Sequence, residues 1–249
     1  MNMKIEVRRR MVGTIPLLEV VAQDKLYEKL PLIVYYHGWQ TQKELVLTQG
    51  RKLAQAGFRV VLPDAENHGE RKRAVSTIPS LTFWQSIQTN LFEFELIVNF
   101  FRQIDVLNGW IGVGGVSMGG MTTCGLLTQH PEINAAACVM GSPAYLKYRD
   151  DLERNIKKLG YHFPKDYHQL LGWLHEYDLE THYASLPKRP LFFWHGTEDE
   201  KIPFEQVSHF VDQYAGDEIL FHSETERHLV KGETMNQVTD FFVEAYQAN

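Results

Sequence analysis

The stretch Trp110-Ile-Gly-Val-Gly-Gly-Val-Ser-Met-Gly-Gly120 decides the fold class of this 249-residue chain. Its first seven residues form an apolar run that is too short for a helix and typical of a strand buried on both faces. A helical pattern follows from residue 118 to residue 128. At the junction lies Gly-x-Ser-x-Gly, with glycines at 115 and 119 around Ser117. A strand-to-helix turn this sharp leaves no room for side chains at the two glycine positions, so the pattern predicts a nucleophile elbow that exposes the Ser117 hydroxyl.

Strands and helices alternate on both sides of this stretch. Buried or alternating strand patterns occupy residues 4–12, 15–22, 31–36, 58–62, 110–116, 135–140, 191–194 and 218–221. Helical patterns occupy residues 44–56, 82–106, 118–128, 204–214 and 232–247. Such alternation requires right-handed crossovers. It therefore predicts an α/β fold with a mainly parallel sheet that is flanked by helices on both faces.

One segment breaks the alternation. Residues 144–187 contain no buried-strand run and instead show a helical pattern that is rich in aromatic residues. No Ser/Gly-rich linker, low-complexity tract or internal repeat is visible in the sequence. We therefore expect a single domain over residues 1–249, with residues 144–187 as a helical cap insertion within it.

The composition excludes several classes of protein. A hydrophobic content of 44%, a charged content of 22% and a net charge of −6 are those of a globular chain without the basic surface that nucleic acid binding needs. Two cysteines are too few for a disulfide framework. The N-terminus lacks the apolar core of a signal peptide, and no run approaches the ~20 residues of a membrane span. We therefore expect a cytoplasmic protein. The sequence does not decide whether it forms a homo-oligomer.

A serine hydroxyl becomes a nucleophile when a histidine takes its proton and a carboxylate orients that histidine. In open parallel sheets, ligands bind beyond the carboxyl ends of the strands, so the acid should follow a late strand. Asp199 lies shortly after the strand at 191–194, and Glu198 and Glu200 are its neighbours.

Two histidines between the last strand and the last helix are candidates for the base. His222 comes directly after Phe221, where strand alternation turns a side chain into the sheet packing. His228 lies in a loop of polar residues just before the last helix, from which it can reach back to Ser117. The order of serine, acid and histidine along the chain is that of enzymes with this elbow, and it favours His228.

The developing oxyanion of an acyl transfer needs two N–H donors about 3 Å away. One is the backbone N–H of Met118, directly after the serine. The other should come from the loop after an earlier strand, and His37-Gly38-Trp39 follows the strand at 31–36. Gly38 permits a close approach, so we expect the backbone N–H of Trp39 to be the second donor.

Further residues are candidates for the wall of a substrate pocket. His37 and His68 each precede a glycine near the carboxyl end of a strand. Tyr145 and Trp173 belong to the aromatic residues of the 144–187 segment.

No metal site is expected from the histidines of this segment. His168, His175 and His182 recur every seven residues. On one continuous helix they would be separated by ~10 Å per step, too far to share a metal ion. The Gly112-Val-Gly-Gly stretch does not continue as a dinucleotide-binding sequence, so no cofactor is expected either.

With these residues in place, the chain resembles the α/β-hydrolases, and among them the small bacterial serine esterases related to dienelactone hydrolases and to the catalytic domain of prolyl oligopeptidase. The resemblance extends from about residue 31 to residue 242. It rests on His37-Gly38, Asp64, His68-Gly69, Gly115–Gly120, His195–Pro203 and His228. In proteins with this pattern the loop after the strand turns the residue at position 199 inward, which implies that Asp199 is the acid.

The resemblance and the ordered residues predict a serine hydrolase that cleaves carboxylic esters with short to medium acyl groups. Ser117, His228 and Asp199 would form the catalytic triad, with an acyl-enzyme intermediate, a small-molecule ester as substrate and no cofactor. An acyltransferase or a thioesterase would use the same triad. A peptidase and a ligand-binding protein without catalysis are further alternatives, because the fold alone does not dictate function.

Overall fold

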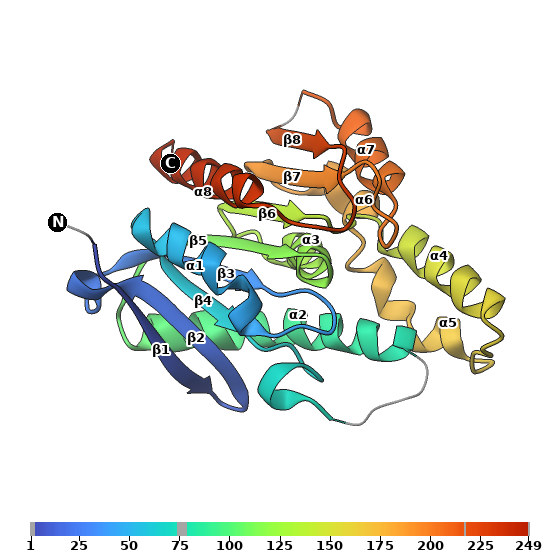
Figure 1. Cartoon of the computed structure of the whole chain (residues 1–249), viewed down its shortest axis with the longest axis horizontal. Coiled ribbons are helices and arrows are strands. Elements are labelled where there is room, and N and C mark those ends of the chain that lie inside the picture. The colour runs from blue at the N-terminus through green and yellow to red at the C-terminus, as the bar shows by residue number, and fades with distance from the viewer. Residues whose placement is uncertain (1–2, 74–78, 217, 249) are drawn as a thin grey trace.

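The computed structural model describes residues 3–73, 79–216 and 218–248. In these residues, eight strands form one twisted sheet in the order β1-β2-β4-β3-β5-β6-β7-β8 (Figure 1). The strands are β1 (Ile5–Val12), β2 (Ile15–Ala22), β3 (Leu30–Tyr36), β4 (Arg59–Pro63), β5 (Leu107–Val116), β6 (Ala135–Val139), β7 (Leu191–Gly196) and β8 (Ile219–Glu224).

The sheet is parallel from β4 to β8, while the N-terminal hairpin adds antiparallel strands at one edge. β1 pairs with β2, and β2 pairs with β4, in antiparallel register. All pairs from β3–β4 to β7–β8 are parallel. The parallel strands β3 to β7 are almost fully buried because helices cover both of their faces, as the continuous apolar runs predict.

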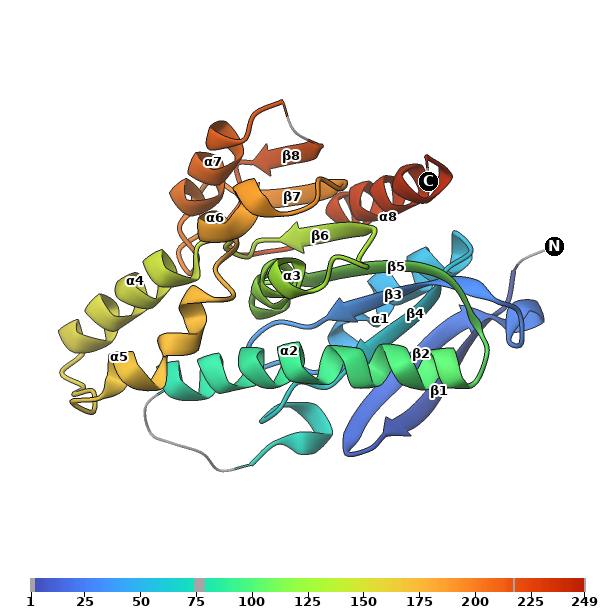
Figure 2. The same cartoon turned by 180° about the vertical axis from the view of Figure 1, so that it is seen from behind.

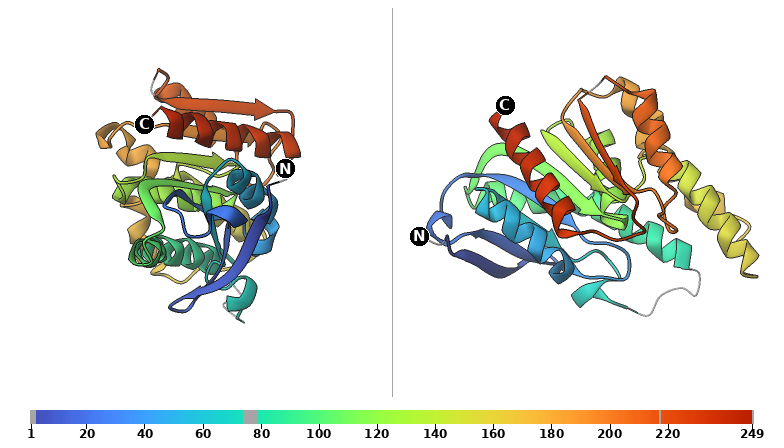
Figure 3. Two further views of the ribbon diagram at one scale, coloured as in Figure 1. Left: turned by 90° about the vertical axis from the view of Figure 1, so that its left-hand side faces the viewer. Right: turned by 45° about the horizontal axis from the view of Figure 1, so that its top comes forward.

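Helices cover the two faces of the sheet (Figures 2 and 3). One apolar core lies under α1 (Leu47–Gln55) and α8 (Gly232–Gln247). The other lies under α2 (Pro79–Gln103), α3 (Met118–Gln129) and α7 (Phe204–Gln213). The α/β fold predicted from the sequence, with a mainly parallel sheet and helices on both of its faces, is confirmed by this architecture.

Several element boundaries differ from the sequence expectation. The helix expected over 44–56 begins as a 3-10 turn (Lys43–Val46) before α1. The helix expected over 82–106 ends at Gln103, because Asp105 adopts a left-handed conformation with φ 58°. The last strand continues to Glu224, three residues beyond its expected end.

The segment between β6 and β7 is helical, as its sequence pattern predicts. It contains α4 (Tyr145–Lys158), α5 (Tyr167–Leu170), a 3-10 turn (Gly172–His175), α6 (Leu179–His182) and a second 3-10 turn (Tyr183–Ser185). Figures 1 and 2 show α4 and α5 beyond the carboxyl ends of the parallel strands, close to the first turns of α2.

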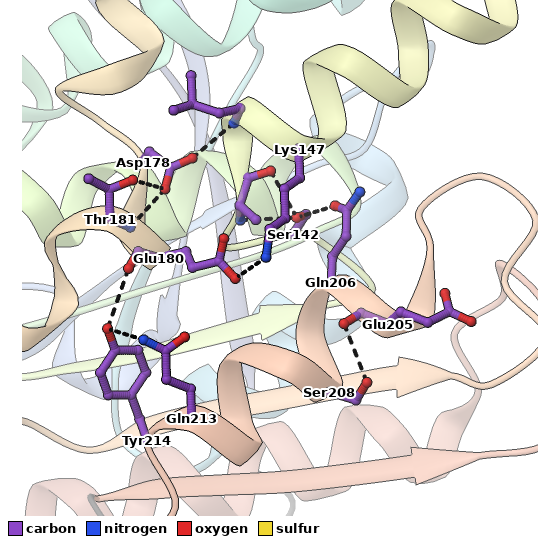
Figure 4. Close-up of polar contacts among 12 residues, drawn as sticks. Ser142, Lys147, Asp178, Glu180, Thr181, Glu205, Gln206, Ser208, Gln213 and Tyr214 are labelled. Carbon is purple, nitrogen blue, oxygen red and sulfur yellow. Dashed lines mark hydrogen bonds and ion pairs between the residues drawn. The ribbon is translucent and has the colours of Figure 1, made fainter.

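Polar contacts hold elements of this segment to one another, and further contacts surround its start beside α7 (Figure 4). Asp178 accepts hydrogen bonds from the backbone N–H of Leu146 (2.9 Å) and of Thr181 (2.8 Å), so it holds the starts of α4 and α6 together. Ser142 donates to Gln206 of α7 at 2.6 Å. Nε2 of Gln206 in turn donates to Oδ2 of Asp151 at 2.8 Å, which links α4 to α7.

Among the described residues, no helix combines the length and the apolar character that crossing a membrane requires.

Candidate active site

Ser117 lies in a strained turn between β5 and α3. Its φ of 56° and ψ of −117° are unusual for a residue with a side chain. The flanking glycines are required by contacts: a Cβ on Gly119 would lie 2.6 Å from the carbonyl carbon of Tyr36, and a Cβ on Gly115 would lie 2.8 Å from the oxygen of the same carbonyl. The turn therefore fits only with glycines at these two positions, and it presents the serine at the start of α3.

A continuous hydrogen-bonded chain leads from Ser117 to Asp199. Nε2 of His228 lies 2.9 Å from Oγ of Ser117. Nδ1 of the same ring lies 2.7 Å from Oδ2 of Asp199. The three residues come from three different loops at the carboxyl ends of β5, β7 and β8.

The Asp199 carboxylate is buried and surrounded by donors. Oδ1 accepts the backbone N–H groups of Lys201 (2.8 Å) and Ile202 (3.0 Å), while Nε2 of His195 lies 3.3 Å from Oδ2. Burial acts to raise the pKa of Asp199, but the hydrogen bonds from His195, His228 and Ile202 outweigh it and hold that pKa well below its usual range. The carboxylate is therefore ionised beside the His228 ring at neutral pH.

The other candidates for acid and base lie elsewhere. The side chains of Glu198 and Glu200 are exposed to solvent. His222 lies within β8, and its ring centroid is 5.5 Å from that of Phe192, so it belongs to the sheet packing. Asp199 thus contacts a second histidine, His195, which the sequence did not single out. In the sequence, His195 is only one of several polar residues at the ends of strands.

The surroundings of Ser117 contain backbone groups that can bind an oxyanion. Met118 is the first residue of α3, where a backbone N–H has no partner within the helix. The loop after β3 passes close to the serine, since a Cβ on Gly38 would lie 3.4 Å from Cβ of Ser117. The backbone of Trp39 follows directly in that loop.

A small, mostly apolar cavity adjoins Ser117. Its volume is about 110 Å³, and it is lined by Trp39, Phe83, Ser117, Tyr148, Leu152, Lys201 and Ile202. Tyr148 and Leu152 lie one turn apart on α4, so the 144–187 segment forms part of the wall. Burial and the charge of Asp199 raise the pKa of Tyr148 to about 12, so its phenol stays protonated.

The four residues proposed as pocket walls lie outside this cavity. Tyr145 is fully buried, and its hydroxyl donates to the carbonyl of Met121 at 2.5 Å. The Trp173 ring packs edge-on against those of Tyr145 and Trp84. These aromatic side chains fill the core instead, because α4 turns Tyr145 toward the sheet layer and Tyr148, three residues later, toward the cavity.

The two histidines beside the Trp39 loop have supporting positions. The ring of His68 is nearly buried and contacts the Trp39 ring edge-on at a centroid distance of 4.9 Å. It lines a separate, larger groove of about 850 Å³, which Trp39 also lines. His37 is buried at the base of the loop and is bonded to backbone groups on both ring nitrogens.

The expected separation of the three histidines in the 144–187 segment is wrong for one pair. His175 and His182 lie on separate short elements rather than on one helix, and their ring centroids are 5.6 Å apart. With Glu176 they form an exposed group whose ligand atoms lie within 4.8 Å of one another. Nε2 of His182 is already 2.8 Å from the carbonyl of His175, and His168 pairs instead with Glu153.

Comparison with known proteins agrees with the fold. Residues 31–201 match the family model described as alpha/beta hydrolase fold, so the chain belongs to this family. It is 34% identical over 214 residues to YitV of Bacillus subtilis (strain 168), with 84% of each chain covered, and that protein's name carries the word esterase. It is 27% identical to Esterase YjfP of Escherichia coli (strain K12), covering 96% of this chain and 98% of the relative. These matches place the chain in the esterase branch of the family.

Solved structures share the fold at low sequence identity. TT1662 from Thermus thermophilus has a TM-score of 0.76 at 16% identity, and the alignment covers 99% of this chain and 100% of that one. The Pyrococcus furiosus esterase Pf2001 has a TM-score of 0.67 at 16% identity, covering 97% and 93%.

Proposed function

We propose that this α/β-hydrolase cleaves carboxylic esters with Ser117 as nucleophile, His228 as general base and Asp199 as the residue that orients it. The hydrogen-bonded chain from Ser117 through His228 to the buried Asp199 carboxylate carries this proposal. The names of YitV and YjfP support the same class of reaction.

The reaction proceeds in two halves. Nε2 of His228 takes the hydroxyl proton as Oγ of Ser117 bonds to the acyl carbon, and the ionised Asp199 stabilises the imidazolium. The backbone N–H groups of Met118 and Trp39 donate to the developing oxyanion. The C–O bond to the alcohol then breaks, and the alcohol leaves with the proton from His228.

Water completes the cycle from the same face. His228, neutral again, takes a proton from a water molecule that attacks the acyl-enzyme. The bond from the acyl carbon to Oγ breaks, Ser117 recovers its proton from His228, and the free carboxylic acid leaves.

The size of the cavity next to Ser117 supports a short substituent on the scissile ester. A volume of about 110 Å³ corresponds to roughly three or four water-sized groups. We therefore propose short to medium acyl groups, with residues 144–187 acting as a cap that belongs to one domain with the sheet. A thioesterase or an acyltransferase would use the same residues, and product analysis with a competing alcohol or thiol separates these activities.

Substitution of Ser117 by alanine tests the proposal. Ser117→Ala should abolish turnover of 4-nitrophenyl acetate and labelling by a fluorophosphonate, while Ser142→Ala, at a buried serine without a histidine partner among its described contacts, should keep both. Full turnover by Ser117→Ala would rule the mechanism out. A wild-type chain that neither turns over esters nor is labelled would favour a ligand-binding protein.

A further inference from the structure

The peptide bond between Gly38 and Trp39 is held by an unusual number of donors. The carbonyl oxygen of Gly38 lies 2.7 Å from Oγ1 of Thr41, which donates to it, and 2.8 Å from Nδ1 of His37. The backbone N–H of Thr41 donates to the same oxygen at 3.3 Å. Three donors thus converge on the carbonyl of the peptide unit whose N–H belongs to Trp39.

The protonation of His37 follows from its other nitrogen. Nε2 accepts the backbone N–H of Ala65 at 3.1 Å, so it carries no proton, and the proton of the neutral ring must lie on Nδ1. Burial lowers the pKa of His37 to about 4, which keeps the ring neutral above that pH. Nδ1–H therefore donates to the Gly38 carbonyl, and it is also 3.2 Å from Oγ1 of Thr41.

The loop from His37 to Lys43 is anchored at its other end to Asp64, which directly precedes Ala65. The backbone N–H of Lys43 donates to Oδ1 of Asp64 at 2.9 Å, and its ammonium group bonds to Oδ2 at 2.6 Å. Both side chains are buried. Asp64 and Ala65 directly follow β4, so the loop from His37 to Lys43 is pinned at both ends to one rigid element.

We propose that Thr41, together with His37, is a positioning residue that aims and polarises the Trp39 N–H for the oxyanion. The C=O and N–H of a planar trans peptide point in opposite directions, so fixing the carbonyl of Gly38 fixes the direction of the N–H of Trp39. Hydrogen bonds to the carbonyl also strengthen the N–H as a donor, by about 10–30% per bond. The inference rests on the proposed ester hydrolysis and adds a residue to it.

Two substitutions at Thr41 separate this role from simple packing. Thr41→Val keeps the shape of the side chain and removes its hydroxyl donor, whereas Thr41→Ser keeps the donor and removes a methyl group. Loss of one neutral hydrogen bond is worth about 1 kcal/mol, so kcat for 4-nitrophenyl acetate should fall about fivefold to tenfold in Thr41→Val. KM should stay near the wild-type value, and Thr41→Ser should restore kcat.

A second measurement reports on the oxyanion itself. A trifluoromethyl ketone adds to the serine and leaves an oxyanion in place, so its inhibition constant should rise in Thr41→Val by the same factor by which kcat falls. If Thr41 contributed only to packing, Thr41→Val and Thr41→Ser would instead both show a lower melting temperature. If the wild type hydrolyses esters and Thr41→Val matches it in kcat and in inhibition constant, the inference is wrong while the proposed function stands. A wild type without esterase activity overturns both.

Discussion

Replacing Asp199 with asparagine tests how the His228 ring is oriented. The carboxylate has two sides: Oδ1 accepts two backbone N–H groups, of Lys201 and Ile202, and Oδ2 faces the ring nitrogens of His228 and His195. An asparagine can keep its oxygen on the backbone side only by turning its NH2 group toward the rings. That NH2 group would then donate to Nδ1 of His228.

The consequence for catalysis is large. If Nδ1 accepts a hydrogen bond, the ring proton moves to Nε2, which then faces Ser117 as a donor and cannot take its proton. Loss of the correct tautomer of a triad histidine costs about 10⁴-fold in kcat. The fold should lose much less, at most about 3 kcal/mol, because the two backbone bonds survive.

The assay combines activity with stability. The initial rate of 4-nitrophenyl acetate hydrolysis at pH 8 should drop about 10⁴-fold in Asp199→Asn, while thermal unfolding stays cooperative. Glu200→Gln is the matched control, since Glu200 is an exposed carboxylate next in sequence. An Asp199→Asn variant within tenfold of wild type, or an equal loss in Glu200→Gln, would refute the assignment of Asp199.

Three more outcomes follow from the geometry. Gly119→Ala places a methyl group 2.6 Å from the carbonyl carbon of Tyr36. The midpoint of urea unfolding should therefore fall by the equivalent of about 3 kcal/mol or more. An unchanged midpoint would contradict the close backbone contact described for this turn. Leu152→Ala widens the cavity beside Ser117. In a series of esters of increasing acyl length, the highest kcat/KM should therefore shift toward longer acyl chains. An unchanged profile would show that the acyl group binds outside this cavity. Because burial lowers the pKa of His37 from 6.5 to about 4, the unfolded chain binds a proton that the folded chain does not over this range. Stability should therefore fall by roughly 3 kcal/mol between pH 6.5 and pH 4, and His37→Asn should flatten this part of the melting-temperature profile.

The fold was predictable because its signals are local. A buried parallel strand is visible in the sequence as an apolar run. The Gly-x-Ser-x-Gly motif predicts the sharp turn from β5 into α3 because it lies between a strand pattern and a helical pattern. Ser117, His228 and Asp199 became candidates for the same reason, since each follows the carboxyl end of a strand in a parallel sheet. The choice of Asp199 over its two acidic neighbours came from the resemblance to the α/β-hydrolases.

The walls of the cavity were not predictable in the same way. Tyr145 and Tyr148 are three residues apart on α4, and only the packing angle of that helix decides that Tyr148 faces Ser117. The distance between His175 and His182 was predicted wrongly because the prediction assumed one continuous helix. The chain instead bends between two short elements. The role proposed for Thr41 depends on a loop conformation that leaves no pattern in the sequence.

The most direct test of the central claim is mass spectrometry of the trapped intermediate. The enzyme is mixed with 4-nitrophenyl acetate, quenched in acid within the first turnover and digested. The account predicts one added acetyl group on the peptide that contains Ser117, and none on that peptide in Ser117→Ala. Release of nitrophenol by an active enzyme with no acetyl group on Ser117, or with the group on another residue, would contradict it.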